Sequence, residues 1–145
     1  MPNTDIGRLK EIAFSVRQIL ERYSLSKNDI MFQLFPRGCC GPASELLGRC
    51  LIELGFANVS YIPAERRDDT RSHAWINVDD VIVDITADQF GEPSVIVSRV
   101  SSWHAQWCTK PAQPICSPDQ WPAYPHAAWQ LIVDEMPRLR ALTSA

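Results

Sequence analysis

The residues best suited to covalent chemistry are two adjacent cysteines in the segment Gly38-Cys-Cys-Gly-Pro-Ala-Ser44. A helix is predicted to begin at Pro42, because the fixed φ of proline suits the first helical position. A thiol just before a helix is favoured as the thiolate by the helix dipole and by free backbone N–H groups. Gly38 and Gly41 leave the sulfur accessible and let backbone amides approach a developing oxyanion. The segment therefore predicts a nucleophilic cysteine.

A histidine and an aspartate follow on two predicted neighbouring strands. His73 opens one strand, and Asp84 lies on the next one, across the short Asp79-Asp80 connection. In a thiol enzyme a histidine moves the proton, and a carboxylate holds the imidazole in the required tautomer. The sequence thus supplies a candidate for each of three catalytic roles. Asp88, four residues further on, is the alternative carboxylate.

These motifs together resemble a known group of enzymes. The stretch from Gly38 to Phe90 looks like the core of the transglutaminase-like division of the papain-like cysteine enzymes, with Gly-x-Cys before a helix, His73-Ala-Trp75 opening a strand and Asp84-Ile-Thr86 on the next. Cys40-Gly-Pro-Ala43 is also similar to the nucleophile region of bacteriocin-leader cysteine peptidases, which share that fold. The resemblance implies Cys40 as nucleophile, His73 as general base and acid, and Asp84 as the orienting carboxylate.

The position of the nucleophile is open between Cys39 and Cys40. Gln33 lies six residues before Cys39 and seven before Cys40, and the oxyanion glutamine of papain-like enzymes usually lies six before its cysteine. We favour Cys40 because a glycine stands two residues before it and Gly-Pro-Ala follows it. On this interpretation Gln33, Cys39, Gly41 and Trp75 contribute to the oxyanion and substrate-binding site.

Other aromatic and thiol residues are more typical of structure than of chemistry. Trp75 is expected either to wall the cleft or to pack in the core. His104 and Cys108 have the i,i+4 spacing of two metal ligands on a helix, but two ligands without a third do not make a zinc site. We therefore expect no metal and no organic cofactor. Cys50 is predicted to be a core residue, and Cys116 carries no interpretation.

Three helices are predicted to position these residues. Residues 5–23 have apolar side chains at three- and four-residue spacing, with Thr4 or Asp5 as N-cap and the segment 24–28 as the end. The second helix runs from Pro42 to Gly55, a glycine typical of a helix stop. The last helix begins near Pro125 and is interrupted or kinked at Pro137.

Four segments rich in β-branched and aromatic residues, 59–62, 72–78, 81–85 and 94–98, are predicted to form one antiparallel sheet. The charged segment Glu65–Asp69 between the first two is predicted to be a solvated loop. Five prolines between Pro111 and Pro125 argue against a regular element there. The order helix, helix, sheet, helix predicts an α+β fold for a single domain spanning residues 1–145, with the N-terminal helices packed on the sheet.

Composition narrows the function classes. The chain has 145 residues, 46% of them hydrophobic, and a formal net charge of −3, which is typical of one soluble domain and gives no basic patch for nucleic acid or anionic lipid. No apolar run approaches the length of a membrane span. The N-terminus lacks the features of a signal peptide, so we expect a cytoplasmic protein. Five cysteines without a CxxC pair indicate reduced thiols.

We therefore expect a cysteine hydrolase that acts on peptide or glutamine carboxamide bonds of a protein or peptide substrate. A thiol peptidase or amidohydrolase is the first choice, and a protein-glutamine deamidase or transglutaminase is the alternative. A catalytically silent interaction module of the same fold is the second hypothesis, because the domain is small and its C-terminal third is apolar and proline-rich. The sequence leaves the oligomeric state open.

Overall fold

The computed structural model describes residues 4–26, 29–122 and 125–143. Within them lie four α-helices and six strands, which confirms the α+β class. The helices are α1 (Ile6–Ser26), α2 (Cys40–Glu53), α3 (Ser102–Ala105) and α4 (His126–Arg140). The strands are β1 (Val59–Glu65), β2 (Ser72–Val78), β3 (Val81–Asp84), β4 (Ile96–Ser98), β5 (Cys108–Thr109) and β6 (Gln113–Pro114). Two 3₁₀ turns complete the order, η1 (Ala87–Phe90) and η2 (Pro118–Gln120).

Helix α1 has the predicted amphipathic pattern. Leu9, Ile12, Val16 and Leu20 are all fully buried along one face. Asp5 caps the helix, since its Oδ1 accepts a hydrogen bond from the backbone N–H of Arg8 at 3.0 Å. The helix continues to Ser26, and residues 27 and 28 of the predicted terminating segment lie outside the described residues.

Helix α2 begins at Cys40, two residues earlier than predicted. The Cys39 carbonyl accepts the first helical hydrogen bond from the N–H of Ala43 at 2.8 Å. Pro42 therefore stands within the first turn, where its missing N–H costs nothing. After Glu53 the chain turns at Gly55, whose φ of 94° is in the left-handed region that glycine adopts readily. As a result Cys40 belongs to the first turn of the helix and not to the preceding loop.

The predicted antiparallel sheet is confirmed. Its strand order is β4-β3-β2-β1-β5, and β6 pairs with the opposite end of β1. Val78 pairs with Val81 across the Asp79-Asp80 turn, and Asp79 has a φ of 54°. Its Oδ1 accepts a hydrogen bond of 2.6 Å from the Asn58 side chain, which holds this glycine-free hairpin turn.

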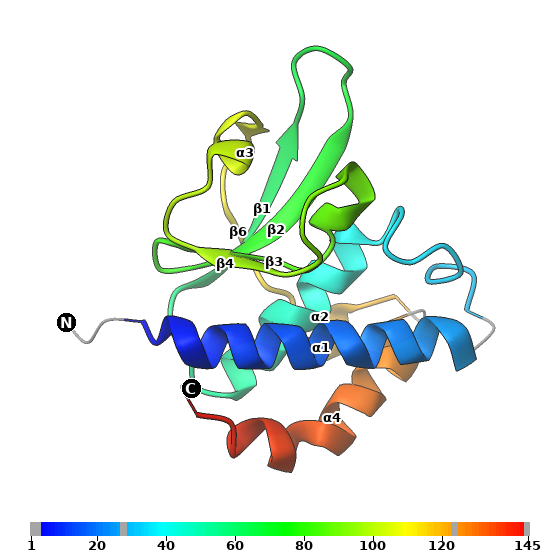
Figure 1. The fold of residues 1–145 in the computed structure, drawn as a ribbon. Coiled ribbons are helices and arrows are strands. Elements are labelled where there is room, and N and C mark those ends of the chain that lie inside the picture. The colour runs from blue at the N-terminus through cyan, green and yellow to red at the C-terminus, as the bar shows by residue number, and fades with distance from the viewer. Residues whose placement is uncertain (1–3, 27–28, 123–124, 144–145) are drawn as a thin grey trace.

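Helices α1, α2 and α4 gather on one side of the sheet, whereas α3 lies apart from them (Figure 1). Successive side chains of a strand point to opposite faces. Ile76 and Val78 of β2 therefore join the aliphatic core under α1 and α2. His73 and Trp75 of the same strand lie on the other face, which carries the aromatic residues. Strand β2 thus borders both environments.

Two sequence predictions about prolines are wrong in part. The proline-rich segment contains β6 and η2, because Pro114 pairs at a sheet edge where its missing N–H is tolerated. Helix α4 continues through Pro137 to Arg140. The proline removes only the hydrogen bond to the carbonyl of Val133, and Val133 is 38% exposed, so water can replace that bond.

The charged loop also departs from a purely solvated turn. Glu65 is the last residue of β1, and the guanidinium of Arg66 lies 4.8 Å from the ring centre of Trp107 and 5.0 Å from that of Phe90. These contacts attach the start of the loop to the aromatic face. In the described residues, no helix is long and apolar enough to cross a membrane.

Candidate active site

Two histidines from different elements meet at one oxygen of Asp84, the last residue of β3. The Nε2 atoms of His73 and His104 each lie 2.7 Å from Asp84 Oδ2. The backbone N–H of Thr86 donates to Oδ1 at 2.9 Å. The three side chains are buried, with at most 3% exposed. Because an ionised carboxylate only accepts hydrogen bonds, both imidazoles donate their Nε2 protons to it.

The network favours the ionised form of this buried carboxylate. Burial alone raises the pKa of Asp84, but the hydrogen bonds from His104, His73 and the Thr86 amide outweigh it and hold the pKa below its ordinary value. A charged Asp84 then acts on the imidazole beside it. Burial lowers the pKa of His73, whereas the hydrogen bond to Asp84 and the interaction with the Cys40 sulfur raise it, with a net result of about 9. His73 is therefore protonated at neutral pH.

Cys40 is the cysteine that faces His73. Since Nε2 of His73 is engaged by Asp84, Nδ1 is the nitrogen left for the sulfur, and it makes no hydrogen bond of normal geometry in the described residues. The sulfur nevertheless contributes to the raised pKa of the ring. Hydrogen bonds between catalytic groups are often long or misaligned in the absence of substrate. Cys40, His73 and Asp84 are thus brought together as the sequence predicted.

Cys39 has a different environment although it is the adjacent residue. Its side chain is fully buried, and its Sγ lies 3.0 Å from the carbonyl oxygen of Met31 and 3.3 Å from that of Arg37. Burial, followed by the proximity of Cys40, raises the pKa of Cys39 to about 11. The thiol is therefore protonated and holds the turn before α2. It does not reach the surface as a substrate-binding group would.

Two backbone N–H groups near Cys40 are available as hydrogen-bond donors. The N–H groups of Cys40 and Gly41, in the first turn of α2, have no acceptor within the helix. Gly38 has a φ of 68° and no atom within 4 Å of where a Cβ would lie. Gln33 is exposed in the turns that precede α2. Its role as an oxyanion donor stays a prediction.

His104 is the member of the network that the sequence analysis missed. The Ser101 side chain caps the short helix α3 by accepting from the His104 backbone N–H at 3.2 Å, and its Oγ lies 2.6 Å from His104 Nδ1. Since Nε2 carries the proton donated to Asp84, Nδ1 accepts one from the Ser101 hydroxyl. Cys108, whose spacing from His104 matched that of two metal ligands, lies exposed on β5. The Ser-x-x-His spacing signals a capped turn, but not its contact with Asp84.

Asp88, the alternative carboxylate, is committed elsewhere. Arg17 of α1 donates to both of its oxygens, at 2.7 and 2.8 Å, and also to the Ile85 carbonyl at 2.8 Å. This buried guanidinium fixes the turn that follows β3 and leaves Asp84 as the carboxylate on His73. The fallback assignment to Asp88 is therefore wrong.

Four aromatic rings surround His73. The ring centres of Trp75, Phe90, Trp103 and Trp107 lie between 5.1 and 5.7 Å from that of His73. Trp75 also makes an edge contact with His104 at 4.7 Å. Of the two expectations for Trp75, packing describes its position best, since it is only 3% exposed. Rings that exclude water strengthen the hydrogen bonds between the charged groups.

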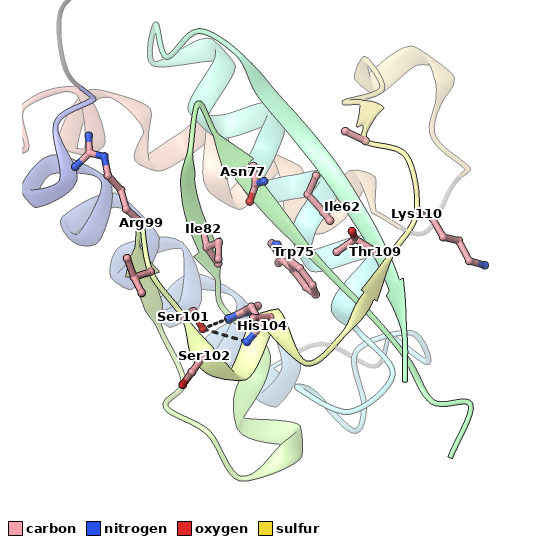
Figure 2. Close-up of a pocket in the computed structure, with 13 residues that line it drawn as sticks. Ile62, Trp75, Asn77, Ile82, Arg99, Ser101, Ser102, His104, Thr109 and Lys110 are labelled. Carbon is pink, nitrogen blue, oxygen red and sulfur yellow. Dashed lines mark hydrogen bonds between the residues drawn. The ribbon is translucent and has the colours of Figure 1, made fainter. Parts of the chain in front are cut away.

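One pocket adjoins this network at His104. It measures about 620 Å³, and Ile62, Trp75, Ile82 and His104 contribute to its walls. In Figure 2 these side chains surround the pocket, and dashed lines join Ser101 to His104. Neither Cys40 nor His73 lines it, so this cavity is not where the sulfur would meet a substrate.

Two smaller pockets adjoin the N-terminus of α2. One, of about 490 Å³, includes Arg37, which precedes the two cysteines, and Ser72, which precedes His73. The other, of about 250 Å³, includes Gly41 and Tyr61 together with residues of the proline-rich segment. Neither pocket is lined by Cys40 or His73, but their walls include neighbours of both, Gly41 after Cys40 and Phe90 against the His73 ring.

His73, Asp84 and His104 also have the donor types of a metal site, with ligand atoms within 4.8 Å of one another. A zinc ion would lie about 2 Å from each donor atom and hold nitrogen and oxygen more than 3 Å apart in a tetrahedral site. The observed separations of 2.7 Å are instead those of ordinary N–H···O hydrogen bonds. The cluster therefore has the geometry of a proton network.

No family model matches this chain, and no curated protein sequence or solved structure matches it either. The arguments about function consequently rest on the residues and their geometry.

Proposed function

We propose that the protein is a cysteine hydrolase of the transglutaminase-like division of the papain-like enzymes, with Cys40 as nucleophile. The observation that carries the proposal is the orientation of His73. Its Nε2 is held 2.7 Å from the buried Asp84 carboxylate, and its other nitrogen is left for the sulfur at the start of α2. This is the arrangement of a cysteine, histidine and carboxylate triad.

The proposed reaction begins with attack of the Cys40 sulfur, as thiolate, on a carboxamide carbon. The carbonyl oxygen becomes an oxyanion that the N–H groups of Cys40 and Gly41 can stabilise. The intermediate collapses as the C–N bond breaks, and protonated His73 gives its Nδ1 proton to the leaving amine. Water then attacks the thioester, His73 takes a proton from it, and the C–S bond breaks to release a carboxylic acid and regenerate the thiolate.

Asp84 and His104 support His73 without touching the substrate. The negative charge of Asp84 stabilises the imidazolium that donates the proton, and its hydrogen bond fixes which nitrogen faces the sulfur. His104 and Ser101 in turn hold the carboxylate in place. In this scheme they are positioning residues.

Hydrolysis of a peptide or amide bond is the first choice within this chemistry because it needs only water as acceptor. Deamidation of a glutamine side chain uses the same steps with ammonia as the leaving group. Transamidation would require an amine to reach the thioester before water does.

Alkylation of the five thiols tests the proposal without a substrate. Iodoacetamide is applied near pH 6.5, and each cysteine is followed by mass spectrometry in the wild type and in His73→Ala. Exposed thiols are mostly protonated at this pH, so Cys40 should react on the order of 100-fold faster than Cys108 and Cys116, which serve as internal references. Cys39 should stay protected in the folded protein.

The rate at Cys40 should fall in His73→Ala while the two reference thiols keep their rates. Equal rates at Cys40, Cys108 and Cys116, unaffected by His73, would favour the silent interaction module. A reactive Cys40 justifies a search with peptide libraries, in which cleavage and deamidation give different product masses.

A further inference from the structure

The pocket of about 490 Å³ near His73 differs from the other pockets because two arginines and, among the described residues, no carboxylate line it. It is lined by Arg37, Arg71, Ser72, Gln89 and Phe90. Two of these residues lie close in sequence to Cys40 or His73, and a third contacts His73 in space. Arg37 stands three residues before Cys40, Ser72 precedes His73, and the Phe90 ring lies 5.1 Å from the His73 ring. The contact of Phe90 with His73 places this pocket near the imidazole.

The two arginines give the pocket a positive charge. Arg37 is exposed and forms no ion pair with any described residue. The Arg71 side chain is 63% exposed, and its Nε lies 3.8 Å from Asp69 Oδ2, a separation that leaves most of its donors free. Both guanidinium groups can therefore bind another anion.

No carboxylate among the described residues lines the pocket to neutralise these charges. Asp88, next to Gln89 in sequence, is held by Arg17 through two hydrogen bonds. Asp69 is tied to the loop itself, since its Oδ1 accepts from the Arg71 backbone N–H at 3.1 Å. The nearby acidic groups are thus already occupied by partners within the chain.

We propose that this pocket binds a carboxylate of the substrate, so that the enzyme acts on amide bonds next to an acidic residue or a free carboxyl group. The inference rests on the proposed function and specifies its substrate class. A planar carboxylate matches the paired donors of a guanidinium, and Gln89 and Ser72 supply neutral polar groups beside it.

Two alkylating agents of nearly equal size test the proposal. Iodoacetate carries the carboxylate, and iodoacetamide is its neutral counterpart. Both form a C–S bond at Cys40 and release iodide. The measured quantity is the ratio of the iodoacetate rate to the iodoacetamide rate at Cys40, in the wild type, in Arg37→Gln, in Arg71→Gln and in the double variant.

Each replacement should lower this ratio about threefold, and the double variant about tenfold, as expected for charges several ångströms apart in an aqueous pocket. Arg22→Gln, a remote change on α1 with the same effect on net charge, should leave the ratio unchanged. Arg37→Lys and Arg71→Lys keep the positive charge, so their rate ratios should stay close to that of the wild type. Raising the salt concentration to about 0.5 M should reduce the difference between wild type and the double variant.

The outcomes separate the two proposals. If Cys40 reacts rapidly in a His73-dependent way but the ratio is the same in the wild type and the double variant, the anion pocket is wrong and the catalytic assignment stands. If Cys40 reacts no faster than Cys108 with either reagent, the catalytic assignment itself fails.

Discussion

The two faces of the sheet differ in chemistry although they share the same strands. The face under α1 and α2 is aliphatic, and Ile76, Val81 and Val83 on it are fully buried. The opposite face carries His73 and Asp84, which His104 joins among four aromatic rings. Along β2 the two environments alternate residue by residue.

This difference indicates a division of labour. The aliphatic face supplies burial of apolar area, which stabilises the fold without introducing charge. The aromatic face contains buried charges, which cost free energy unless they are paired and hydrogen-bonded. On this face the charges are paired by the hydrogen bonds that join His73, Asp84, His104 and Ser101. Substitutions on the two faces should therefore have separable effects.

The largest effect is expected from Asp84→Asn. The variant keeps the shape of the side chain but loses the charge that stabilises protonated His73 and can stabilise the wrong tautomer. Turnover of a substrate identified from the library should fall by about 10³- to 10⁴-fold. Retention of more than a tenth of the wild-type rate would contradict the role of Asp84. Circular dichroism of the variant checks that the fold is retained.

Ile76→Ala should lower stability but leave the reactivity of Cys40 unchanged. Removal of a fully buried side chain from β2 leaves a cavity near Gly48 of α2 and should lower the free energy of unfolding by about 2–5 kcal/mol. Urea titration measures this change, and Ile76→Val should cost only about 0.5–1.5 kcal/mol. Below the onset of unfolding, the preferential alkylation of Cys40 should persist. Its loss in the folded variant would show that the faces are not separable.

The pH dependence of stability follows from the aromatic face. The pKa of His73 is raised from 6.5 to about 9 in the folded protein, so its stabilising contribution is complete below pH 6.5 and is lost as the pH rises to about 9. The contribution should amount to about 3 kcal/mol. The pKa of Asp84 is lowered, so its contribution is present above the ordinary carboxyl pKa and is lost as the pH falls.

Urea titrations from pH 5 to 10 measure this effect in the wild type and in His73→Phe. The wild type should lose stability between pH 6.5 and 9, and His73→Phe should show a flatter profile over that interval. Parallel profiles in the two proteins would show that His73 is not protonated in the folded state.

His104→Ala is expected to have the smallest effect. Asp84 loses one of two imidazole donors, which should slow turnover about tenfold, as for other residues that orient a functional group. His104→Gln can still donate a hydrogen bond and should recover part of the rate. Because Asp84 then holds His73 less firmly, the alkaline limb of the pH–rate profile should move in His104→Ala and return in His104→Gln. A stability loss without movement of that limb would indicate a structural role only.

Much of the fold could be predicted because its signals are local. The spacing of apolar residues in α1, the capping by Asp5 and the alternation in β2 depend on neighbours a few positions away. The errors arose where tertiary contacts overrode local propensity. Pro137 stays within α4 at a position where Val133, whose carbonyl it leaves unpaired, is partly exposed, and Pro114 is accepted at a sheet edge.

For the candidate site, the sequence by itself determined that Cys40, His73 and Asp84 are present with types and spacings that suit a triad. It favoured Cys40 over Cys39 through the flanking glycines, but the spacing from Gln33 fitted Cys39, so local signals alone disagreed. The tertiary structure gives the two thiols different environments by burying that of Cys39 against two backbone carbonyls. It also assigned Asp88 to Arg17 and brought His104 to Asp84 across 20 residues. Contacts between residues distant in sequence depend on how the elements pack, and no pattern confined to one element encodes them.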